Sequence, residues 1–173
     1  MEVILEAIWF FLPAGVSNMM PVVAAKAPVI KNWDWPISTK HFGKNKTYRG
    51  IILGTLVAML LVLVQYKLTP EFYENLIPGI SAIKVALIGA LLGFGALFGD
   101  IVESYFKRLR GTAPGESWLP FDQIDYVLGA IIFSLPVVQL TLLEYALIIS
   151  IFFGLHIIIV YVFYKLGIRE RPI

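Results

Sequence analysis

Long runs of apolar residues, separated by short polar stretches, make up most of the chain. A helix needs about 20 residues to cross the hydrocarbon core of a bilayer, and five apolar segments are close to that length. They are Val3–Ala25, Gly50–Leu68, Ile80–Tyr105, Tyr126–Leu143 and Tyr145–Tyr164. The pattern predicts an all-α, polytopic membrane protein with five transmembrane helices, forming one membrane-embedded domain over residues 1–173.

The composition supports this class. Hydrophobic residues make up 58% of the chain, only 15% is charged, and the mean hydropathy is +0.80, whereas a soluble domain carries about 25% charged residues. The absence of cysteine excludes disulfides, thiolate nucleophiles and cysteine-based zinc sites. No basic stretch precedes the first apolar segment, so we expect it to remain as a helix and not to be cleaved as a signal peptide.

The basic residues indicate how the chain is oriented. If five helices cross the membrane, all of the 14 Lys and Arg residues except Lys67 and Lys84 lie on one side. By the positive-inside rule, the amino terminus is outside, and the carboxyl terminus and the loops at about 26–49 and 107–125 are cytoplasmic. We therefore expect a multi-pass protein of the cell membrane whose active site faces the cytoplasm.

The third apolar segment becomes ionic within one turn of helix. Because an α-helix rotates about 100° per residue, small and ionic residues share one stripe, and the small ones are expected to pack against another helix. The stripe comprises Gly89, Gly93, Ala96, Asp100, Glu103, Ser104 and Lys107. An ionised side chain in a spanning helix costs roughly 2.5 to 3.5 kcal/mol on insertion scales, so the acidic pair Asp100 and Glu103 indicates a functional site.

A second acidic pair follows the loop after this segment. Asp122 and Asp125 are three residues apart and share a helix face, and two antiparallel helices would bring them close to Asp100 and Glu103. Four crowded carboxylates repel one another or take up protons, which a divalent cation relieves. Oxygen ligands without His or Cys favour Mg²⁺, Mn²⁺ or Ca²⁺ over zinc, and Mg²⁺ completes its shell with substrate phosphates. The sequence thus predicts a metal site of these four acids and a phosphorylated ligand.

Basic residues near the two loops have two interpretations. Lys46, Arg49, Lys107 and Arg108 could bind phosphate oxygens. A cytoplasmic face carries basic residues in any case, and an ion pair between Lys107 and Asp100 could be purely structural.

Two polar residues lie within apolar segments. Asn18 lies between Pro13 and Pro21, where lipid offers no hydrogen-bond partner, so its amide either bonds another helix or lines the site. His156 lies in the last apolar segment, and we expect it to be packed and satisfied there, with no role in the site.

Three blocks of the sequence carry most of this chemistry. They are Lys46-Thr47-Tyr48-Arg49-Gly50, then Gly99-Asp100-Ile101-Val102-Glu103-Ser104 with Lys107-Arg108, then Asp122-Gln123-Ile124-Asp125. In spacing and order these blocks resemble the CTP-dependent cytidylyltransferases of phospholipid synthesis, most closely the archaeal CDP-archaeol synthases. The bacterial relatives usually have Gly-His-Gly-Gly before the acidic pair and Arg where this chain has Gln123, so the resemblance favours the archaeal ether lipid.

The resemblance implies transfer of a cytidylyl group from CTP to 2,3-bis-O-geranylgeranylglycerol 1-phosphate, giving CDP-archaeol and pyrophosphate with Mg²⁺ as cofactor. Its partners would be CTP, this isoprenoid ether lipid phosphate and membrane lipids, with no nucleic acid. Asp100 and Asp125 are the expected leading metal ligands, with Glu103 and Asp122 as further ligands or their supports. Asp100, Asp125 and Lys107 are the expected catalytic residues, and the expected substrate-binding residues are Asn18, Lys46, Thr47, Arg49, Ser104 and Arg108.

The sequence leaves other function classes open. A cation or proton-coupled transporter would also carry acids within the membrane, but it predicts an internal repeat or paired broken helices, and no repeat is visible. A purely structural membrane subunit is a third hypothesis. A CDP-alcohol phosphotransferase is disfavoured because its Asp-Gly-x-x-Ala-Arg opening is missing. The sequence does not decide whether the chain acts alone or as a homodimer.

Overall fold

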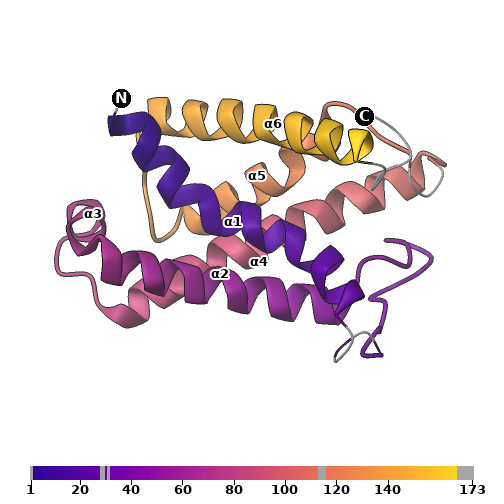
Figure 1. Ribbon diagram of the computed structural model, residues 1–173, viewed down its shortest axis with the longest axis horizontal. Coiled ribbons are helices and arrows are strands. Elements are labelled where there is room, and N and C mark those ends of the chain that lie inside the picture. Colours follow the sequence, from indigo (N-terminus) through magenta and orange to yellow (C-terminus); the bar gives the residue numbers. More distant parts are fainter. Residues whose placement is uncertain (1, 28–29, 31, 113–115, 167–173) are drawn as a thin grey trace.

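The computed structural model describes residues 2–27, 30, 32–112 and 116–166, and this part of the chain folds as a bundle of helices (Figure 1). The helices are α1 (Glu2–Lys26), α2 (Tyr48–Leu68), α3 (Pro70–Leu76), α4 (Ala82–Leu109), α5 (Phe121–Ser134) and α6 (Leu142–Lys165). Apart from one isolated β-bridge, between Pro36 and Thr47, the described residues form no β-structure. The all-α prediction is confirmed.

Four of these helices, α1, α2, α4 and α6, are long and apolar enough to cross a membrane. Helix α5 has 14 residues, which corresponds to about 21 Å and is shorter than a hydrocarbon core of about 30 Å. The structure therefore supports a polytopic membrane protein. The count of five crossings and the orientation of the termini stay predictions.

The bounds predicted for the fourth apolar segment, Tyr126–Leu143, are wrong at both ends. Its helix begins at Phe121, where Asp122 in the first turn suits the positive end of the helix dipole. It ends at Ser134, because Pro136 has no N–H to continue the helix. A new helix then starts from a capping box, in which Thr141 and Glu144 hydrogen-bond each other's backbone N–H.

Helix α1 contains a proline whose effect is compensated by α2. Pro13 has no N–H to donate to the carbonyl of Trp9, one turn earlier. The side chain of Gln65 donates to that carbonyl instead, with Nε2 2.7 Å from the oxygen, and the hydroxyl of Tyr73 donates to Gln65 Oε1 at 2.9 Å. This buried polar network joins α1, α2 and α3 near the amino-terminal half of α1.

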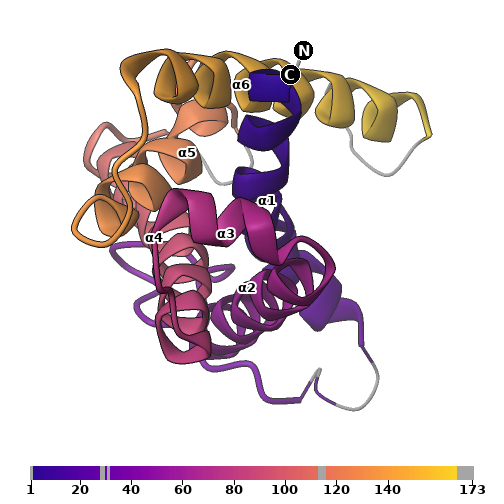
Figure 2. The same cartoon turned by 90° about the vertical axis from the view of Figure 1, so that its left-hand side faces the viewer.

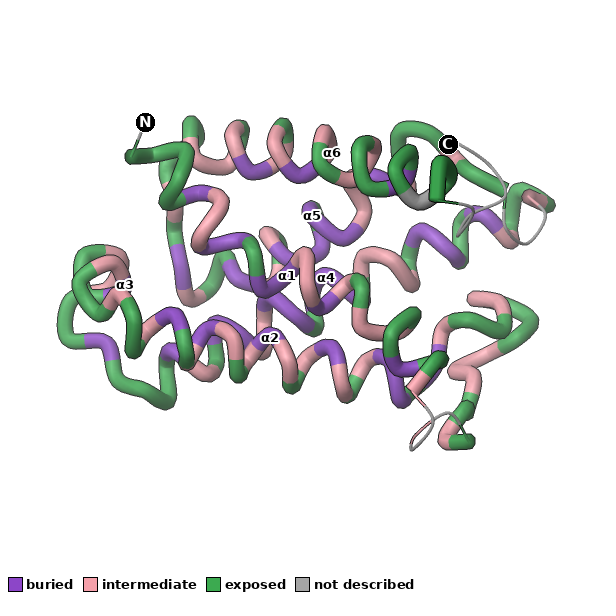
Figure 3. Tube along the Cα trace, in the orientation of Figure 1, coloured by how far each residue is buried: buried purple, intermediate pink, exposed green. Residues whose placement is uncertain are grey.

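The small residues of α4 pack against α2, as predicted. A Cβ atom at Gly89 would lie 2.6 Å from the Cα of Met59, and one at Gly93 would lie 2.6 Å from the Cβ of Ala58. Only glycine permits so close an approach of two helices. Figure 3 shows buried residues where the helices cross and exposed residues on the outer faces of the bundle.

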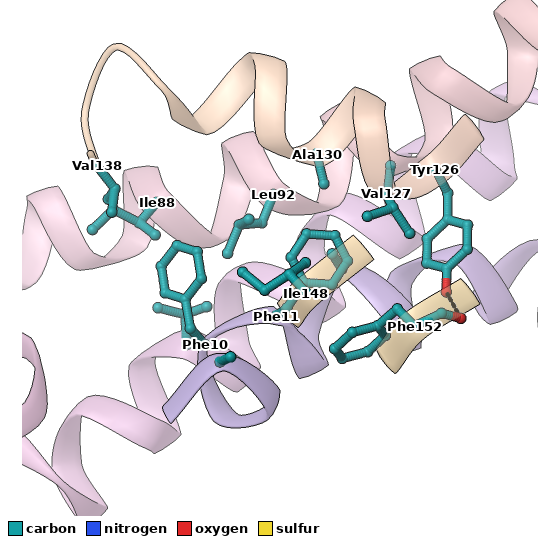
Figure 4. Packing of buried hydrophobic residues seen from close by; sticks show 14 of the residues in the cluster. Phe10, Phe11, Ile88, Leu92, Tyr126, Val127, Ala130, Val138, Ile148 and Phe152 are labelled. Carbon is teal, nitrogen blue, oxygen red and sulfur yellow. Dashed lines mark hydrogen bonds between the residues drawn. The ribbon is translucent and has the colours of Figure 1, made fainter. Parts of the chain in front are cut away.

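The apolar core lies where α1, α4, α5 and α6 meet (Figure 4). The ring of Phe11 contacts the ring of Phe152, with centroids 4.8 Å apart, and both are buried. The hydroxyl of Tyr126 donates to the carbonyl of Phe152 at 3.2 Å and ties α5 to α6. Large apolar side chains also cover the outside, including Leu142, which is 85% exposed, as expected for helices surrounded by lipid.

Candidate active site

Two glycines allow α4 and α5 to touch backbone to backbone. A Cβ atom at Gly99 would overlap the carbonyl oxygen of Asp125, and one at Gly129 would overlap the carbonyl oxygen of Gly95. Because neither glycine has a side chain, the first turns of α5 lie directly on α4. This contact brings Asp125 to the acidic pair of α4.

Three carboxylates converge at this helix contact. One oxygen from each of Asp100, Glu103 and Asp125 lies within 4.8 Å of the others. Glu103 is buried and the other two are partly buried. We name these three residues the acid group. In the part of the chain that the structure describes, no hydrogen bond reaches the buried Oε1 of Glu103, although Lys107 Nζ lies 3.3 Å away.

The fourth predicted acid, Asp122, lies outside the acid group. Its two carboxylate oxygens accept hydrogen bonds from Lys107 Nζ at 2.8 and 2.9 Å, and one of them also accepts from the backbone N–H of Trp118. Lys107 thus bridges Asp122 and Glu103, and it is not paired with Asp100. The ammonium of Lys107 ties the start of α5 to the end of α4.

Lys46 reaches the acid group from the loop before α2. Its Nζ lies 2.5 Å from Asp100 Oδ2. Two backbone hydrogen bonds, from Ile37 N to Lys46 O and from Tyr48 N to Trp35 O, hold the loop in place. Burial lowers the pKa of Lys46, but the carboxylate of Asp100, aided by the other two acids, raises it more, so the net pKa is above its ordinary value. The ammonium therefore stays charged.

The next two predicted residues shape the same loop. The hydroxyl of Thr47 accepts a hydrogen bond from Gly50 N at 3.1 Å and so caps α2. The guanidinium of Arg49 is buried and donates to the carbonyl of Ile30 at 3.0 Å and to Asp34 Oδ1 at 3.3 Å. Arg49 thus fixes the loop between α1 and α2.

A polar cavity of about 790 Å³ lies on one side of the acid group. Side chains from α1, the following loop, α4 and α6 line it, and its polar lining includes Asn18, Lys44, Asn45, Lys46, Thr47, Arg49, Asp100 and His156. Four predicted substrate-binding residues, Asn18, Lys46, Thr47 and Arg49, therefore share one cavity. His156 was not predicted to belong there; a polar side chain in so apolar a helix was the only signal in the sequence.

An apolar groove of about 530 Å³ lies on the other side of the acid group, along α4 and α5. Its lining includes Phe98, Val102, Phe106, Trp118, Phe121, Leu128, Ile132 and Phe133, with Glu103 and Asp125 among them. The acid group therefore faces both spaces, through Asp100 toward the cavity and through the other two acids toward the groove. Ser104, Lys107 and Arg108 are not among the residues found to line either space, and Ser104 Oγ lies 3.5 Å from Glu103 Oε2.

The sequence matches a known protein family over its whole length. The CarS-like CDP-archaeol synthase family model matches residues 1–173. The chain belongs to the CDP-archaeol synthase family. The CDP-archaeol synthase of Thermococcus onnurineus is 36% identical over 172 residues, covering 98% of this chain and 96% of its own. That of Methanospirillum hungatei is 30% identical over 168 residues, covering 93% and 99%.

A solved structure of an intramembrane enzyme for archaeal membrane lipid biosynthesis has a similar fold. It superposes with a TM-score of 0.71 at 25% sequence identity, and the match covers 88% of this chain and 91% of the other. The resemblance of the three sequence blocks to the CDP-archaeol synthases is thus confirmed. These relatives do not favour the transporter reading.

Proposed function

We propose that this chain transfers the cytidylyl group of CTP to 2,3-bis-O-geranylgeranylglycerol 1-phosphate, producing CDP-archaeol and pyrophosphate. One observation carries the proposal: the acid group lies between a polar cavity and an apolar groove. A nucleotide and a lipid phosphate are the kinds of substrate that would fit these two spaces and meet at the acids between them. The membership of the chain in the CDP-archaeol synthase family supports this assignment.

The polar cavity is the proposed site for CTP. Its volume is within the range of about 300 to 1,000 Å³ found for small-molecule sites. Lys44 and Lys46 line it and would bind phosphate oxygens, and Lys46 would do so beside Asp100. Arg49 would support the site by holding the loop that carries both lysines.

The apolar groove is the proposed site for an isoprenoid chain of the lipid. Its lining side chains are apolar except for Glu103 and Asp125. A chain lying in the groove would place the lipid phosphate near these two acids. The side chains of Phe98 and Phe133, whose ring centroids are 5.3 Å apart, would contact the chain farther along α4 and α5.

The residues present fit a divalent cation. The donors are carboxylate oxygens only, they converge from two helices, and one oxygen of Glu103 has no hydrogen bond within the described residues. Such a set suits Mg²⁺, which Asp100, Glu103 and Asp125 would hold. When bound, the ion would neutralise charge on the nucleotide phosphates.

The chain's own residues would position the reactants, since the reaction requires no side-chain nucleophile. The second pKa of a phosphate monoester is about 6, so the lipid phosphate is mostly a dianion at pH 7. One of its oxygens forms a bond to the α-phosphorus of CTP, and the bond from that phosphorus to the bridging oxygen of the β-phosphate breaks, releasing pyrophosphate. Lys46 would bind phosphate oxygens, and Lys107 would keep Glu103 in place through their ion pair.

Label transfer tests this function. The purified protein, in liposomes containing the lipid phosphate, is incubated with CTP labelled at the α-phosphate, and we expect label in the organic extract only when Mg²⁺ is present. CTP labelled at the γ-phosphate is the control, because its label leaves with pyrophosphate. Absence of α-label from the lipid would contradict the proposal.

We also propose that α5 and the segment after it make a fifth crossing, with the amino terminus outside and the site at the cytoplasmic face. Single cysteines test the orientation, because the chain contains none. Lys40 in the loop before α2 and Glu71 in α3 are both exposed. In intact cells, an impermeant maleimide should label Glu71→Cys and should not label Lys40→Cys. The opposite pattern would reverse the orientation.

A further inference from the structure

The polar cavity holds a pair of side chains that the proposed chemistry does not use. Asn18 from α1 and His156 from α6 line the same cavity as Lys46 and Asp100. A carboxamide and a neutral imidazole each offer both a hydrogen-bond donor and an acceptor. Such groups are suited to hydrogen-bonding with the polar edge of a heterocyclic base.

These two residues lie more than two helical turns before the lysine that ends each helix. Asn18 precedes Lys26, the last residue of α1, by eight residues, and His156 precedes Lys165, the last of α6, by nine, which corresponds to about 12 and 14 Å. Figures 1 and 2 show α1 starting beside α6 and then running away from it. The cavity is thus lined by residues from the parts of α1 and α6 that lie beyond the point where the two helices diverge.

The ring of His156 is supported by a neighbour of the acid group. It packs against the ring of Tyr126, with centroids 5.8 Å apart, and Tyr126 follows Asp125 directly. The hydroxyl of Tyr126 donates to the carbonyl of Phe152, one turn before His156. The contact with Tyr126 therefore relates the position of His156 to that of the carboxylates.

The cavity also has apolar lining residues. Pro21 and Val22 of α1, and Leu97 and Ile101 of α4, line the same cavity. A flat base needs apolar contact on its faces and neutral donors and acceptors at its edge, whereas phosphates need cations. The cavity offers apolar contacts and neutral polar groups that suit a base, and the lysines of the loop provide the cations that suit phosphates.

We propose that Asn18 and His156 bind the pyrimidine base of the nucleotide and select cytosine over uracil, an inference that rests on the proposed function. Cytosine presents an amino group and an unprotonated ring nitrogen where uracil presents a carbonyl oxygen and an N–H. The donor and acceptor positions are therefore exchanged between the two bases. A site that pairs with one pattern leaves buried polar groups unpaired when it binds the other, which is how hydrogen-bonding sites reject close analogues.

The test compares CTP with UTP as the nucleotide donor. In the label-transfer assay with His156→Leu and Asn18→Leu, we expect the ratio of kcat/KM for CTP to that for UTP to fall at least tenfold, on the order of the loss of one hydrogen bond. The KM for CTP should rise, and the KM for the lipid phosphate should not change. Ile158→Ala is the control, since Ile158 is 59% exposed on the same helix, and it should keep the wild-type ratio.

An unchanged CTP/UTP ratio in active variants would overturn the proposal, as would a rise in the KM for the lipid phosphate alone. His156→Gln, which keeps a donor and an acceptor, should retain more of the selectivity than His156→Leu. If no variant transfers label, thermal shift reports binding directly: CTP should stabilise the wild type more than UTP does, and this difference should shrink in His156→Leu and less so in His156→Gln. A wild type that binds CTP selectively without labelling lipid would refute the proposed function and leave base selection standing.

Discussion

Gly99 of α4 lies against the backbone of Asp125 of α5, so closely that a Cβ atom at Gly99 would overlap the carbonyl oxygen of Asp125. Two residues that are 26 positions apart in sequence are thereby held in backbone contact. The same contact places the side chain of Asp125 within reach of Asp100 and Glu103. The geometry of the acid group therefore depends on a residue that has no side chain.

Gly99→Ala should separate the two helices. Overpacking of this kind costs about 1 to 3 kcal/mol, and a misplacement of about 1 Å in a catalytic site can reduce the rate about 100-fold. We expect a lower Tm and a loss of transfer activity near that size. Gly154→Ala in α6 is the matched control, because a Cβ atom there would meet no atom within 4 Å; equal losses in both variants would contradict this role of the helix contact.

Asp125→Asn should affect catalysis and metal dependence together. The substitution keeps the shape of the side chain but removes a negative charge from the acid group, so a bound Mg²⁺ would be held less tightly. We expect the Mg²⁺ concentration for half-maximal activity to rise about tenfold or more. Glu71→Gln on α3, which removes an exposed carboxylate, should leave the titration unchanged. An unaltered Mg²⁺ titration in Asp125→Asn would remove Asp125 from the metal site.

Asp122→Asn should affect stability more than metal dependence. Asp122 accepts hydrogen bonds from Lys107 and from the backbone of Trp118, so its loss weakens the junction of α4 and α5 by roughly 1 to 3 kcal/mol. Thermal unfolding should show a lower Tm, while the Mg²⁺ titration stays close to that of the wild type. A shift in the Mg²⁺ titration as large as that of Asp125→Asn would show that Asp122 also binds the metal.

Leu128→Trp should interfere with the lipid and not with the nucleotide. Leu128 lines the apolar groove and is 40% exposed, so a larger ring there would occupy space proposed for an isoprenoid chain without disturbing the buried core. We expect the KM for the lipid phosphate to rise several-fold with little change in the KM for CTP. Leu128→Met, which nearly conserves volume, should behave like the wild type; a rise in the KM for CTP alone would assign the groove to the nucleotide.

The existence of most helices was predictable because apolar runs are local. The ranges expected for α1, α2 and α4 agree with the structure to within a few residues. The segment around α5 was misjudged because its residues stay apolar beyond Ser134, so hydropathy does not mark the end. Pro136 and the capping box at Thr141 set that boundary, through backbone hydrogen bonds that an average over a window does not detect.

The candidate site was predictable in its chemistry and less so in its pairings. Lys46, Asp100, Glu103 and Asp125 could be chosen from residue type and spacing, and the structure places them together. The same spacing made Asp122 a candidate on a par with Glu103, although in the structure its carboxylate pairs with Lys107 and, of these two acids, only Glu103 belongs to the acid group. His156 was not predicted as a site residue because its neighbours in sequence are apolar.

The sequence by itself determined a membrane-embedded, all-helical chain with acids and lysines clustered around two loops, because hydropathy and charge act through composition and short spacing. Only the tertiary structure decided which acids converge at one site, which acid each lysine pairs with, and which cavities open beside them. Those outcomes depend on where α4 and α5 cross. The crossing is set by contacts between glycines that are far apart in the sequence.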